Sequence, residues 1–388
     1  MMREGWEYKK FDEVFNLQMG KTPNRKNPDY FGGKNVWISI RDLGDKEVLE
    51  SNEHITDKAV SDTNIRKVKK GTVIMSFKLT VGKCGIAAKD LYTNEAIMAF
   101  NTKEGYDINS SFLYYYLQCY NWEGSNKAVM GITLNKATIS KQHINIPPKS
   151  TQLAIVSELD KINELIRLKK EQLKDFDNLA QSLFYEIFGD PVENEKGWEV
   201  KKLNEIVSDN CSISYGIVQP GDGIENGVPV VRPVDMTGTF VYRQGLKNTT
   251  KEISDSYKRT ILKGNEILMC VRGTTGLIAM ASSELRGCNV TRGITPIECG
   301  KSCNKWFIYY QISNSSIQQY IAEYTRGIAL KQINMKDVRD IPLCLPPLPL
   351  QQLFAHRIEQ IEHQKSEVQK AITDLETLLA SRMQYWFE

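Results

Sequence analysis

One stretch of the sequence decides the fold. It runs from Gln152 to Phe188 and reads QLAIVSELDKINELIRLKKEQLKDFDNLAQSLFYEIF. The stretch has no glycine or proline, and Gly189 and Pro191 follow it as stop signals, so we predict one long helix. At about 1.5 Å per residue, this helix would be on the order of 55 Å long.

Apolar residues recur in this stretch at alternating steps of four and three, which is typical of a coiled-coil seam. The seam positions are Ile155, Leu159, Ile162, Ile166, Lys169, Leu173, Phe176, Ala180, Leu183 and Ile187. A helix with a single apolar stripe needs a partner that covers it. Ser150 or Thr151 is a candidate N-cap for the first turn.

A second copy of the pattern, 199 residues further on, supplies that partner. Its seam positions are Phe354, Ile358, Ile361, Lys365, Val368, Ile372, Leu375, Leu379, Arg382 and Trp386. We expect antiparallel pairing, because a parallel pair would require the intervening chain to travel back the length of a helix. The globular parts would then lie at opposite ends of a rod, related by an approximate two-fold axis. Lys169 and Lys365 either fix the alignment of the seam or extend to its surface.

Short sequence words also repeat in the same order outside the helices. The matched pairs are 5–10 with 197–202, 70–75 with 263–269, 131–134 with 327–330, and 147–148 with 346–347. Chance would explain one such match, but four in order indicate a duplicated unit. We divide the chain into a first domain (1–150), a first helix (151–189), a second domain (190–349) and a second helix (350–388).

Both domains have short β-type runs that are broken by turns. Strands are expected at 36–40, 71–77, 228–231 and 266–271, and helices at 109–119 and 303–313. The predicted fold class is therefore α+β: two mixed α/β globular domains separated by two long antiparallel coiled-coil helices.

The charge distribution separates the domains from the helices. The formal net charge is +3, but residues 151–188 carry five Lys/Arg against seven Asp/Glu, and residues 351–388 carry four against six. The remainder is therefore +7, which permits phosphate binding, although a solvated surface would look similar.

Other features of the composition favour a cytoplasmic protein. The eight cysteines lack the paired spacings of a zinc site or a disulfide framework, so reduced thiols are expected. No apolar run approaches the roughly 18 residues of a membrane span, and the polar N-terminus does not resemble a signal peptide.

Basic and polar loop residues are the candidate DNA contacts. Lys and Arg engage phosphates, Asn and Arg engage base edges, and glycine allows close backbone approach. In the first domain the candidates are Lys21, Thr22, Asn24, Arg25, Lys26, Arg41, Lys78, Thr80 and Lys83. In the second domain they are Arg232, Arg272, Thr274, Arg286, Asn289, Arg292 and Arg326. A surface hairpin would also use glycine and lysine, so composition leaves both interpretations open.

The sequence lacks a recognisable catalytic motif. Residues 27–30 differ from the Asn-Pro-Pro-Tyr motif of adenine methyltransferases at Asp29, and no glycine-rich loop follows a strand to hold S-adenosylmethionine. A Gly-x-x-x-x-Gly-Lys phosphate loop is also absent, and the four histidines lack metal-ligand spacing. We therefore expect a non-catalytic chain that holds no metal or cofactor.

The order of these features resembles the specificity (DNA-recognition) subunits of type I restriction-modification systems across essentially the whole chain. The resemblance is carried by Gly20-Lys21-Thr22-Pro23, by the strand with Trp37 and Ile38 before Asp42, by Lys70-Gly71-Thr72-Val73, by Gly82-Lys83, and by Ile146-Pro147-Pro148 with Gln152. The proline junction occurs twice. The second domain departs from the first, with Val230-Val231-Arg232-Pro233-Val234-Asp235 in place of the Trp37 strand.

The resemblance implies that each domain reads one half of a split target in double-stranded DNA, and that the helices set the gap. It also implies two methyltransferase subunits that use S-adenosylmethionine, and restriction-translocase subunits that use ATP and Mg. This chain would hold none of those active sites. One alternative is a coiled-coil scaffold whose end domains bind protein without reading DNA; another is a self-contained nuclease or methyltransferase with degenerate motifs.

Overall fold

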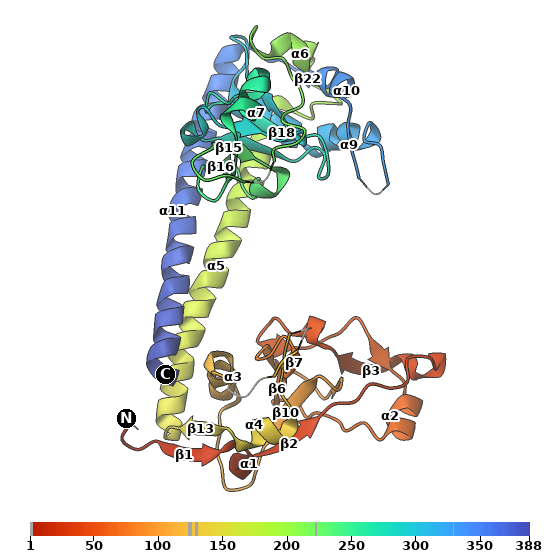
Figure 1. Ribbon diagram of the computed structural model, residues 1–388, viewed down its shortest axis with the longest axis vertical. Coiled ribbons are helices and arrows are strands. Elements are labelled where there is room, and N and C mark those ends of the chain that lie inside the picture. The colour runs from red at the N-terminus through yellow and green to blue at the C-terminus, as the bar shows by residue number, and fades with distance from the viewer. Residues whose placement is uncertain (1–2, 123–125, 129–130, 222, 329) are drawn as a thin grey trace. The chain divides into compact units, whose positions relative to one another are not determined.

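The computed structural model describes residues 3–122, 126–128, 131–221, 223–328 and 330–388 (Figure 1). The chain forms two compact units, one of residues 1–169 with 371–388 and one of residues 170–370. Each unit holds one globular domain and one part of each long helix, α5 (Lys149–Phe188) and α11 (Leu348–Phe387).

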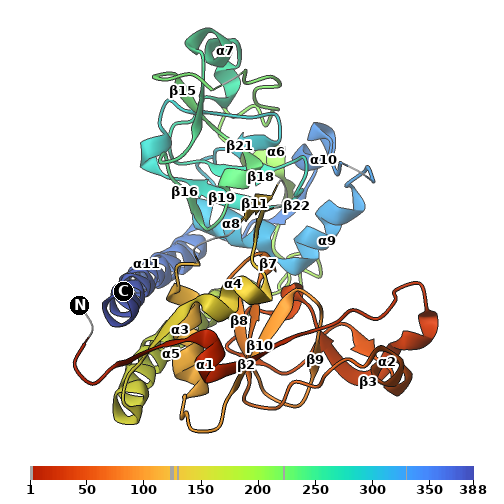
Figure 2. The ribbon, with the colours of Figure 1, turned by 60° about the horizontal axis from the view of Figure 1, so that its bottom comes forward.

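The first unit is organised by a five-stranded sheet in the order β2-β10-β6-β8-β4 (Figure 2). Its inner strands are rich in buried apolar residues, as expected for strands that are covered on both faces. Smaller sheets, β5-β3-β9, β11-β12-β7 and β1-β13, surround it. The strands are β1 (Glu7–Lys10), β2 (Phe15–Met19), β3 (Phe31–Ile38), β4 (Glu47–Val48), β5 (His54–Ile55), β6 (Val73–Ser76), β7 (Lys78–Leu79), β8 (Cys84–Ala87), β9 (Tyr92–Thr93), β10 (Ile97–Thr102), β11 (Asn126–Ala128), β12 (Gly131–Thr133) and β13 (His143–Ile146).

Short helices complete the first domain. They are α1 (Phe11–Val14), α2 (Asp57–Thr63), α3 (Ser110–Cys119) and α4 (Lys136–Lys141), with 3-10 turns at Pro28–Tyr30 and Ile40–Asp42. Helix α3 carries six consecutive buried residues, from Phe112 to Leu117, so it packs inside the domain rather than on its surface.

The second unit is organised by a four-stranded sheet in the order β16-β19-β18-β21, beside the smaller sheets β17-β15-β20 and β14-β22. Its strands are β14 (Val200–Lys202), β15 (Val228–Val231), β16 (Phe240–Val241), β17 (Lys247–Thr249), β18 (Ile267–Cys270), β19 (Ile278–Ala281), β20 (Asn289–Val290), β21 (Ile294–Ile297) and β22 (Pro342–Cys344). Its helices are α6 (Leu203–Ile206), α7 (Lys251–Ser256), α8 (Lys305–Ser313), α9 (Ser315–Glu323) and α10 (Met335–Arg339), with 3-10 turns at Pro233–Asp235, Lys258–Thr260 and Ser283–Leu285.

The two domains repeat the same topology. Strands β10-β6-β8-β4 of the first correspond in order to β21-β18-β19-β16 of the second, and β5-β3-β9 corresponds to β17-β15-β20. The directions also agree: the last pair of the larger sheet is parallel in both domains, and so are β3 with β9 and β15 with β20. The duplication predicted from short sequence words is therefore confirmed, as are the mixed α+β content and the strands and helices expected in each domain.

A buried glutamine lies in the first turn of each long helix. The side chain of Gln152 accepts a hydrogen bond from Asn109 N (2.8 Å) and donates one to Pro147 O (3.0 Å). Gln351 repeats both contacts, with Asn304 N (2.9 Å) and Pro346 O (2.7 Å). Each glutamine thus joins the first turn of a long helix to the start of α3 or α8. The two glutamines make equivalent contacts, so they occupy equivalent positions in the two copies.

The ends of α5 differ partly from expectation. The predicted N-cap at Ser150 or Thr151 is wrong, because the helix begins at Lys149 and Pro148 O accepts the hydrogen bond from Gln152 N (3.0 Å). The predicted stop is confirmed: Gly189 follows the last helical residue with φ +77° and donates to Tyr185 O. Glycine adopts this left-handed conformation without the steric cost of a side chain.

Contacts within each unit show that α5 and α11 pair antiparallel, as predicted. In the first unit, Glu158 near the start of α5 accepts hydrogen bonds from Arg382 and from Trp386 Nε1 (2.9 Å) near the end of α11. In the second unit, Phe188 at the end of α5 lies 5.3 Å, between ring centroids, from Phe354 at the start of α11.

Most of the predicted seam is buried. The buried positions are Ile155, Leu159, Ile162, Ile166, Ala180, Phe354, Ile358, Ile361, Val368 and Ile372. The half-buried ones are Leu173, Phe176, Leu183, Ile187, Leu375 and Leu379. Near the end of α5 the most buried positions lie one residue further on: Phe184 and Phe188 are buried, while the predicted Leu183 and Ile187 are half-buried against the same core. Both rings pack against Phe307 and Phe354, so tertiary packing decides which residues face inward.

Lys365 is a charged member of the seam. Its ammonium group lies 2.8 Å from Asp177 Oδ1 on α5 and 2.9 Å from Glu362 Oε1 on its own helix. Burial by itself would lower the pKa of Lys365, but the hydrogen bonds to Asp177 and Glu362 raise it overall. The lysine is therefore charged and joins the two helices at one level, in keeping with a role in their alignment.

Candidate nucleic-acid interface

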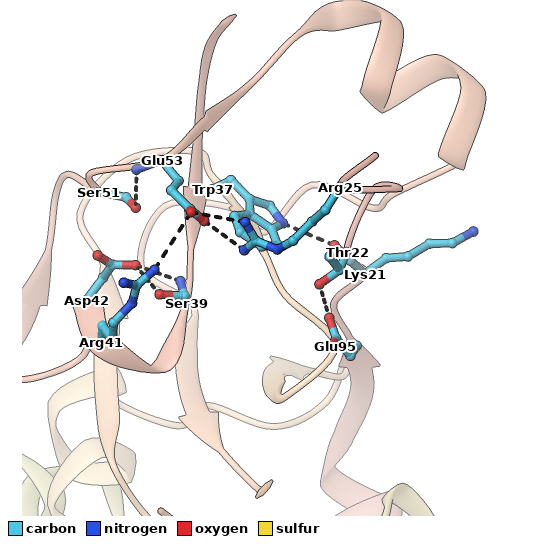
Figure 3. Close-up of polar contacts among 10 residues, drawn as sticks. All are labelled: Lys21, Thr22, Arg25, Trp37, Ser39, Arg41, Asp42, Ser51, Glu53 and Glu95. Carbon is cyan, nitrogen blue, oxygen red and sulfur yellow. Dashed lines mark hydrogen bonds and ion pairs between the residues drawn. The ribbon is translucent and has the colours of Figure 1, made fainter. Parts of the chain in front are cut away.

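The loop that follows β2 in the first domain carries a preoriented arginine. Arg25 donates to both carboxylate oxygens of Glu53, at 3.1 and 3.0 Å, and its guanidinium lies 5.2 Å from the Trp37 ring centroid (Figure 3). Trp37 is fully buried in β3 and donates its indole N–H to Lys21 O at 3.0 Å. The tryptophan thus holds the loop at its base, while Arg25 remains 54% exposed above it.

Glu53 is the electrostatic centre of this group. The hydrogen bond from Arg25 holds the pKa of Glu53 below its usual range, and Arg41 lies 3.7 Å from the same carboxylate. Arg41 itself is 79% exposed. A fixed, partly exposed guanidinium of this kind can present its planar donors to a base edge, whereas a mobile lysine can offer only a point charge.

Of the other predicted contacts of this loop, some are hydrogen-bonded within the protein and one is exposed. Lys21 Nζ donates to Thr63 O at 2.6 Å, and Thr22 donates to Glu95. The side chain of Asn24 accepts from Lys26 N at 3.1 Å, so it shapes the turn, while Lys26 is exposed. Lys26 therefore projects more freely than the other candidates of this loop.

A second polar loop of the first domain spans residues 76–83, between β6 and β8. Lys78 and Lys83 are half-buried and Thr80 is exposed. Lys83 Nζ donates to Ile40 O at 3.2 Å, so it joins this loop to the turn that contains Arg41. Gly82 has φ +87° and donates its N–H to Ser76 O at 3.0 Å, which closes the loop.

The corresponding loop of the second domain spans residues 270–276 and is closed in the same way. Gly276 has φ +86° and donates to Cys270 O at 2.9 Å. Arg272 is half-buried here and Thr274 is exposed. Residues 76–82 match residues 270–276 position by position, with Lys78 at the place of Arg272.

The structure brings three predicted arginines of the second domain together around Gln332. Arg326 and Gln332 exchange two backbone hydrogen bonds of 2.8 Å, and Arg272 forms a backbone bridge to Gln332. The Gln332 side chain donates to the Tyr215 hydroxyl at 3.4 Å, and the Arg292 guanidinium lies 6.0 Å from the Tyr215 ring centroid. Residues widely separated in the sequence thus form one basic group.

Two further predicted arginines lie elsewhere in the second domain. Arg232 is paired with Asp235, with Nε–Oδ2 and Nη2–Oδ1 distances of 3.0 and 2.6 Å. The hydrogen bond to Asp235 raises the pKa of Arg232. Arg286 is exposed in the turn before β20. Arg232 therefore resembles Arg25, as a guanidinium fixed by an acid, and Arg286 is the less constrained of the two.

The prediction that Asn289 contacts DNA is wrong. This residue is fully buried, and its side chain accepts from Thr260 Oγ1 at 2.7 Å and donates to Ser254 Oγ at 3.0 Å. A buried amide with its donors and acceptors satisfied stabilises the domain and is not accessible to a ligand. It joins β20 to α7 through Ser254 and to the 3-10 helix Lys258–Thr260 through Thr260.

Sequence reasoning missed Tyr215, Gln332 and Lys331. Lys331 O accepts from Gly273 N at 2.8 Å, so the chain beyond Arg326 pairs with the loop that contains Arg272. The signal was available in the matched words 131–134 and 327–330, because in the first domain β12 likewise pairs with β7.

All eight cysteines are free. Within the described part of the chain, no group of three or more His, Cys, Asp or Glu side chains could hold a metal ion, and no helix is long and apolar enough to cross a membrane.

The family model described as the type I restriction modification DNA specificity domain matches the chain twice, at residues 3–175 and 195–377. Each match covers one globular domain and most of the long helix that follows it. The chain belongs to the type I restriction-modification DNA specificity family.

Two relatives of known class are similar to this chain and are specificity subunits of type I restriction enzymes. The MjaIX specificity subunit of a type I restriction enzyme from Methanocaldococcus jannaschii is 24% identical over 405 residues, covering 96% of this chain and 90% of the relative. The EcoBI specificity subunit from Escherichia coli is 24% identical over 294 residues, covering 69% of this chain and 61% of the relative.

Two solved structures share the fold across the whole chain. A chain from a type I R-M system complex has a TM-score of 0.61 at 16% identity, covering 100% of this chain and 99% of its own. The S subunit of a type I restriction-modification system from M. genitalium has a TM-score of 0.54 at 14% identity, covering 100% and 96%.

Proposed function

We propose that this chain is the DNA-reading subunit of a type I restriction-modification complex, in which each domain binds one half of a bipartite target in double-stranded DNA. The observation that carries the proposal is the duplicated domain with matching loops at 76–83 and 270–276, within a chain that the family model matches twice. Two similar readers on one chain suit a target with two half-sites.

The proposed contacts divide by chemistry. Arg25 and Arg232 are held by Glu53 and Asp235, so they are assigned to base edges, where orientation matters. Lys26, Arg41 and Arg286 are exposed and are assigned to phosphates, together with the basic group around Gln332.

The partners and cofactors follow from the family. We propose two methyltransferase subunits that use S-adenosylmethionine, and restriction-translocase subunits that use ATP and Mg, all assembled on this chain in the cytoplasm. The chain itself is proposed to be non-catalytic. Methyl transfer to DNA by the purified chain alone would contradict this assignment.

Charge-removing variants test the DNA contacts. Arg272→Ala and Lys83→Ala should each weaken DNA binding of the assembled complex and reduce the slope of log affinity against log salt by about one. Unchanged affinity at physiological salt would remove that residue from the interface. If the wild-type complex bound no DNA in a sequence-dependent manner, the chain would instead be a coiled-coil scaffold for protein partners.

A further inference from the structure

The segment between Arg326 and Gln332 carries a fully exposed apolar side chain. Ile328 has a relative exposure of 104%, so the folded chain does not cover it at all. Single exposed apolar residues are common on protein surfaces and need no special explanation. The position of this one, in a constrained and strongly basic segment, is what distinguishes it.

The segment that carries Ile328 is held firmly at both ends. Arg326 and Gln332 exchange two backbone hydrogen bonds of 2.8 Å, and Gly273 N donates to Lys331 O at 2.8 Å. Thr325 Oγ1 donates to Thr275 Oγ1 at 3.1 Å on the other side. Residue 328 therefore lies near the tip of a loop whose base is fixed to the loop that contains Arg272.

The charged residues of the two paired segments are all basic. Segments 270–276 and 325–332 contain Arg272, Arg326 and Lys331 but no Asp or Glu. A protein partner would need acidic residues around an apolar patch to match them, whereas DNA provides phosphates on both sides of the apolar base surface along its whole length.

The first domain has an apolar side chain in the matching element. Leu79 in β7 is 59% exposed and has φ +63°, a left-handed conformation that a leucine rarely adopts. Its counterpart in the second domain is Gly273, with φ +86°, for which the same backbone carries no strain. The Cα partner of Leu79 in the strand pairing is Ile132, which occupies the place of Ile328 in the repeated words.

The charged residues nearest to Leu79 in the sequence are also basic. Segment 76–83 contains Lys78 and Lys83 but no Asp or Glu. Unfavourable backbone conformations such as that of Leu79 are concentrated at functional sites. Each domain thus presents an exposed apolar side chain from the same pair of matching segments, next to basic residues.

We propose that Ile328 in the second domain, and Leu79 in the first, contact the apolar surface of the DNA bases, either thymine methyl groups or the faces of a partly opened base step. This inference rests on the proposed function. The cations beside each residue would hold the phosphates while the apolar side chain reaches the bases, an arrangement in which apolar contact contributes sequence discrimination and charge contributes affinity.

The test uses the full chain in its assembled methyltransferase complex, and compares affinity for the methylated target with affinity for unrelated duplex. Ile328→Ala removes no contact within the protein, so folding is not at issue. We expect it to reduce target affinity by about tenfold, with unrelated-duplex affinity and the salt slope unchanged. Leu79→Gly should have the same effect in the other half-site. Val200→Ala, an exposed apolar residue on β14, is the matched control and should change nothing.

Ile328→Lys separates base contact from phosphate contact. If the residue faces bases, the added charge lowers the ratio of target to unrelated affinity. If it faces phosphates, the lysine raises both affinities and steepens the salt slope, which would overturn the inference. Equal affinities of wild type and Ile328→Ala for the target would overturn it as well, and so would a defect in methyltransferase assembly with normal DNA discrimination.

Two modified targets assign the base surface. Replacing thymine by uracil in the target removes the methyl group. If wild type and Ile328→Ala then bind that duplex with equal affinity, the isoleucine contacts a thymine methyl group. The second target carries 2-aminopurine in place of a target base. If its fluorescence rises when wild type binds but not when Ile328→Ala binds, the isoleucine contacts a partly opened base step. If the wild-type complex preferred no DNA sequence, the proposed function itself would be rejected. If wild type and Ile328→Ala both preferred the target equally, only the apolar-contact inference would be rejected.

Discussion

Single residues show what the sequence could and could not reveal about the site. Arg25 and Arg232 were identified as basic loop residues, but their fixed orientation depends on Glu53 and Asp235, and Glu53 lies 28 residues from Arg25. Asn289 was assigned to the interface because asparagine often binds base edges, yet the same amide groups satisfy buried polar partners equally well. Residue type alone does not distinguish these two environments, since burial is a property of the folded chain.

Replacing Asn289 by alanine should destabilise the protein. The change leaves Thr260 Oγ1 and Ser254 Oγ without their buried partner, and we expect a loss of about 1–3 kcal/mol in the free energy of unfolding. Urea denaturation of the full chain measures it. Asn265→Ala, at an exposed position in the same domain, is the control and should leave the denaturation midpoint unchanged. An Asn289→Ala variant of normal stability but weakened DNA binding would restore this residue to the interface.

The Arg25–Glu53 pair has a predicted pH dependence. The hydrogen bond from Arg25 depresses the pKa of Glu53 in the folded protein, so the pair stabilises the fold above the unfolded glutamate pKa, and that contribution is lost as the pH falls through the depressed value. Because Arg25 is largely exposed, the effect is at most about 1 kcal/mol. Denaturation midpoints of wild type and Glu53→Gln should differ by a constant amount from pH 6 to 8 and converge below about pH 4. A difference that grows on acidification would contradict the pairing.

Whole elements were predicted better than their ends. The long helices followed from 37 residues without glycine or proline, and their pairing followed from the 199-residue return of the seam. The start of α5 was misplaced by one or two residues, and its first turn is held by a tertiary contact, because Gln152 accepts a hydrogen bond from Asn109 N. The seam near Phe184 shifted by one residue for the same reason, as Phe307 of α8 packs against it. Period and composition identify an element, while its neighbours determine its limits.

The buried glutamines are expected to be important for both junctions. Gln351→Leu leaves Asn304 N and Pro346 O unpaired, so it should cost about 1–3 kcal/mol in the free energy of unfolding. Gln352→Leu makes the same substitution at the next, exposed position and should be nearly neutral in denaturation experiments. Similar midpoints for the two variants would mean that the glutamine contacts contribute little.

At the scale of the whole molecule, the chain is organised as a duplicated unit. Two domains with the same sheet order are each joined to a long helix by the same glutamine, and α5 and α11 contact each other antiparallel within each unit. The repeated words were enough to predict the duplication, and the returning seam was enough to predict the antiparallel pairing. The strand order within the domains was not predictable, because short apolar runs do not specify their partners.

The proposed function gives the paired helices a measurable role as the ruler between half-sites. Removing one four-residue block from the middle of α5 and one from the middle of α11 would shorten each helix by roughly 6 Å, which corresponds to about two base pairs of DNA. We therefore expect the gap in the recognised sequence to shrink while the half-sites stay the same. Sequencing of methylated sites in cells that carry the variant measures the gap, and an unchanged gap would refute the ruler.

The most direct test of the proposed function is methylome sequencing of cells that carry this chain together with the methyltransferase subunits proposed as its partners. The account predicts one motif made of two short specific half-sites separated by a fixed stretch of unspecified bases, with methylated adenine in both halves. Exchanging the second domain for that of a relative should change one half and leave the other intact. A continuous motif, or methylation that does not depend on this chain, would contradict the account.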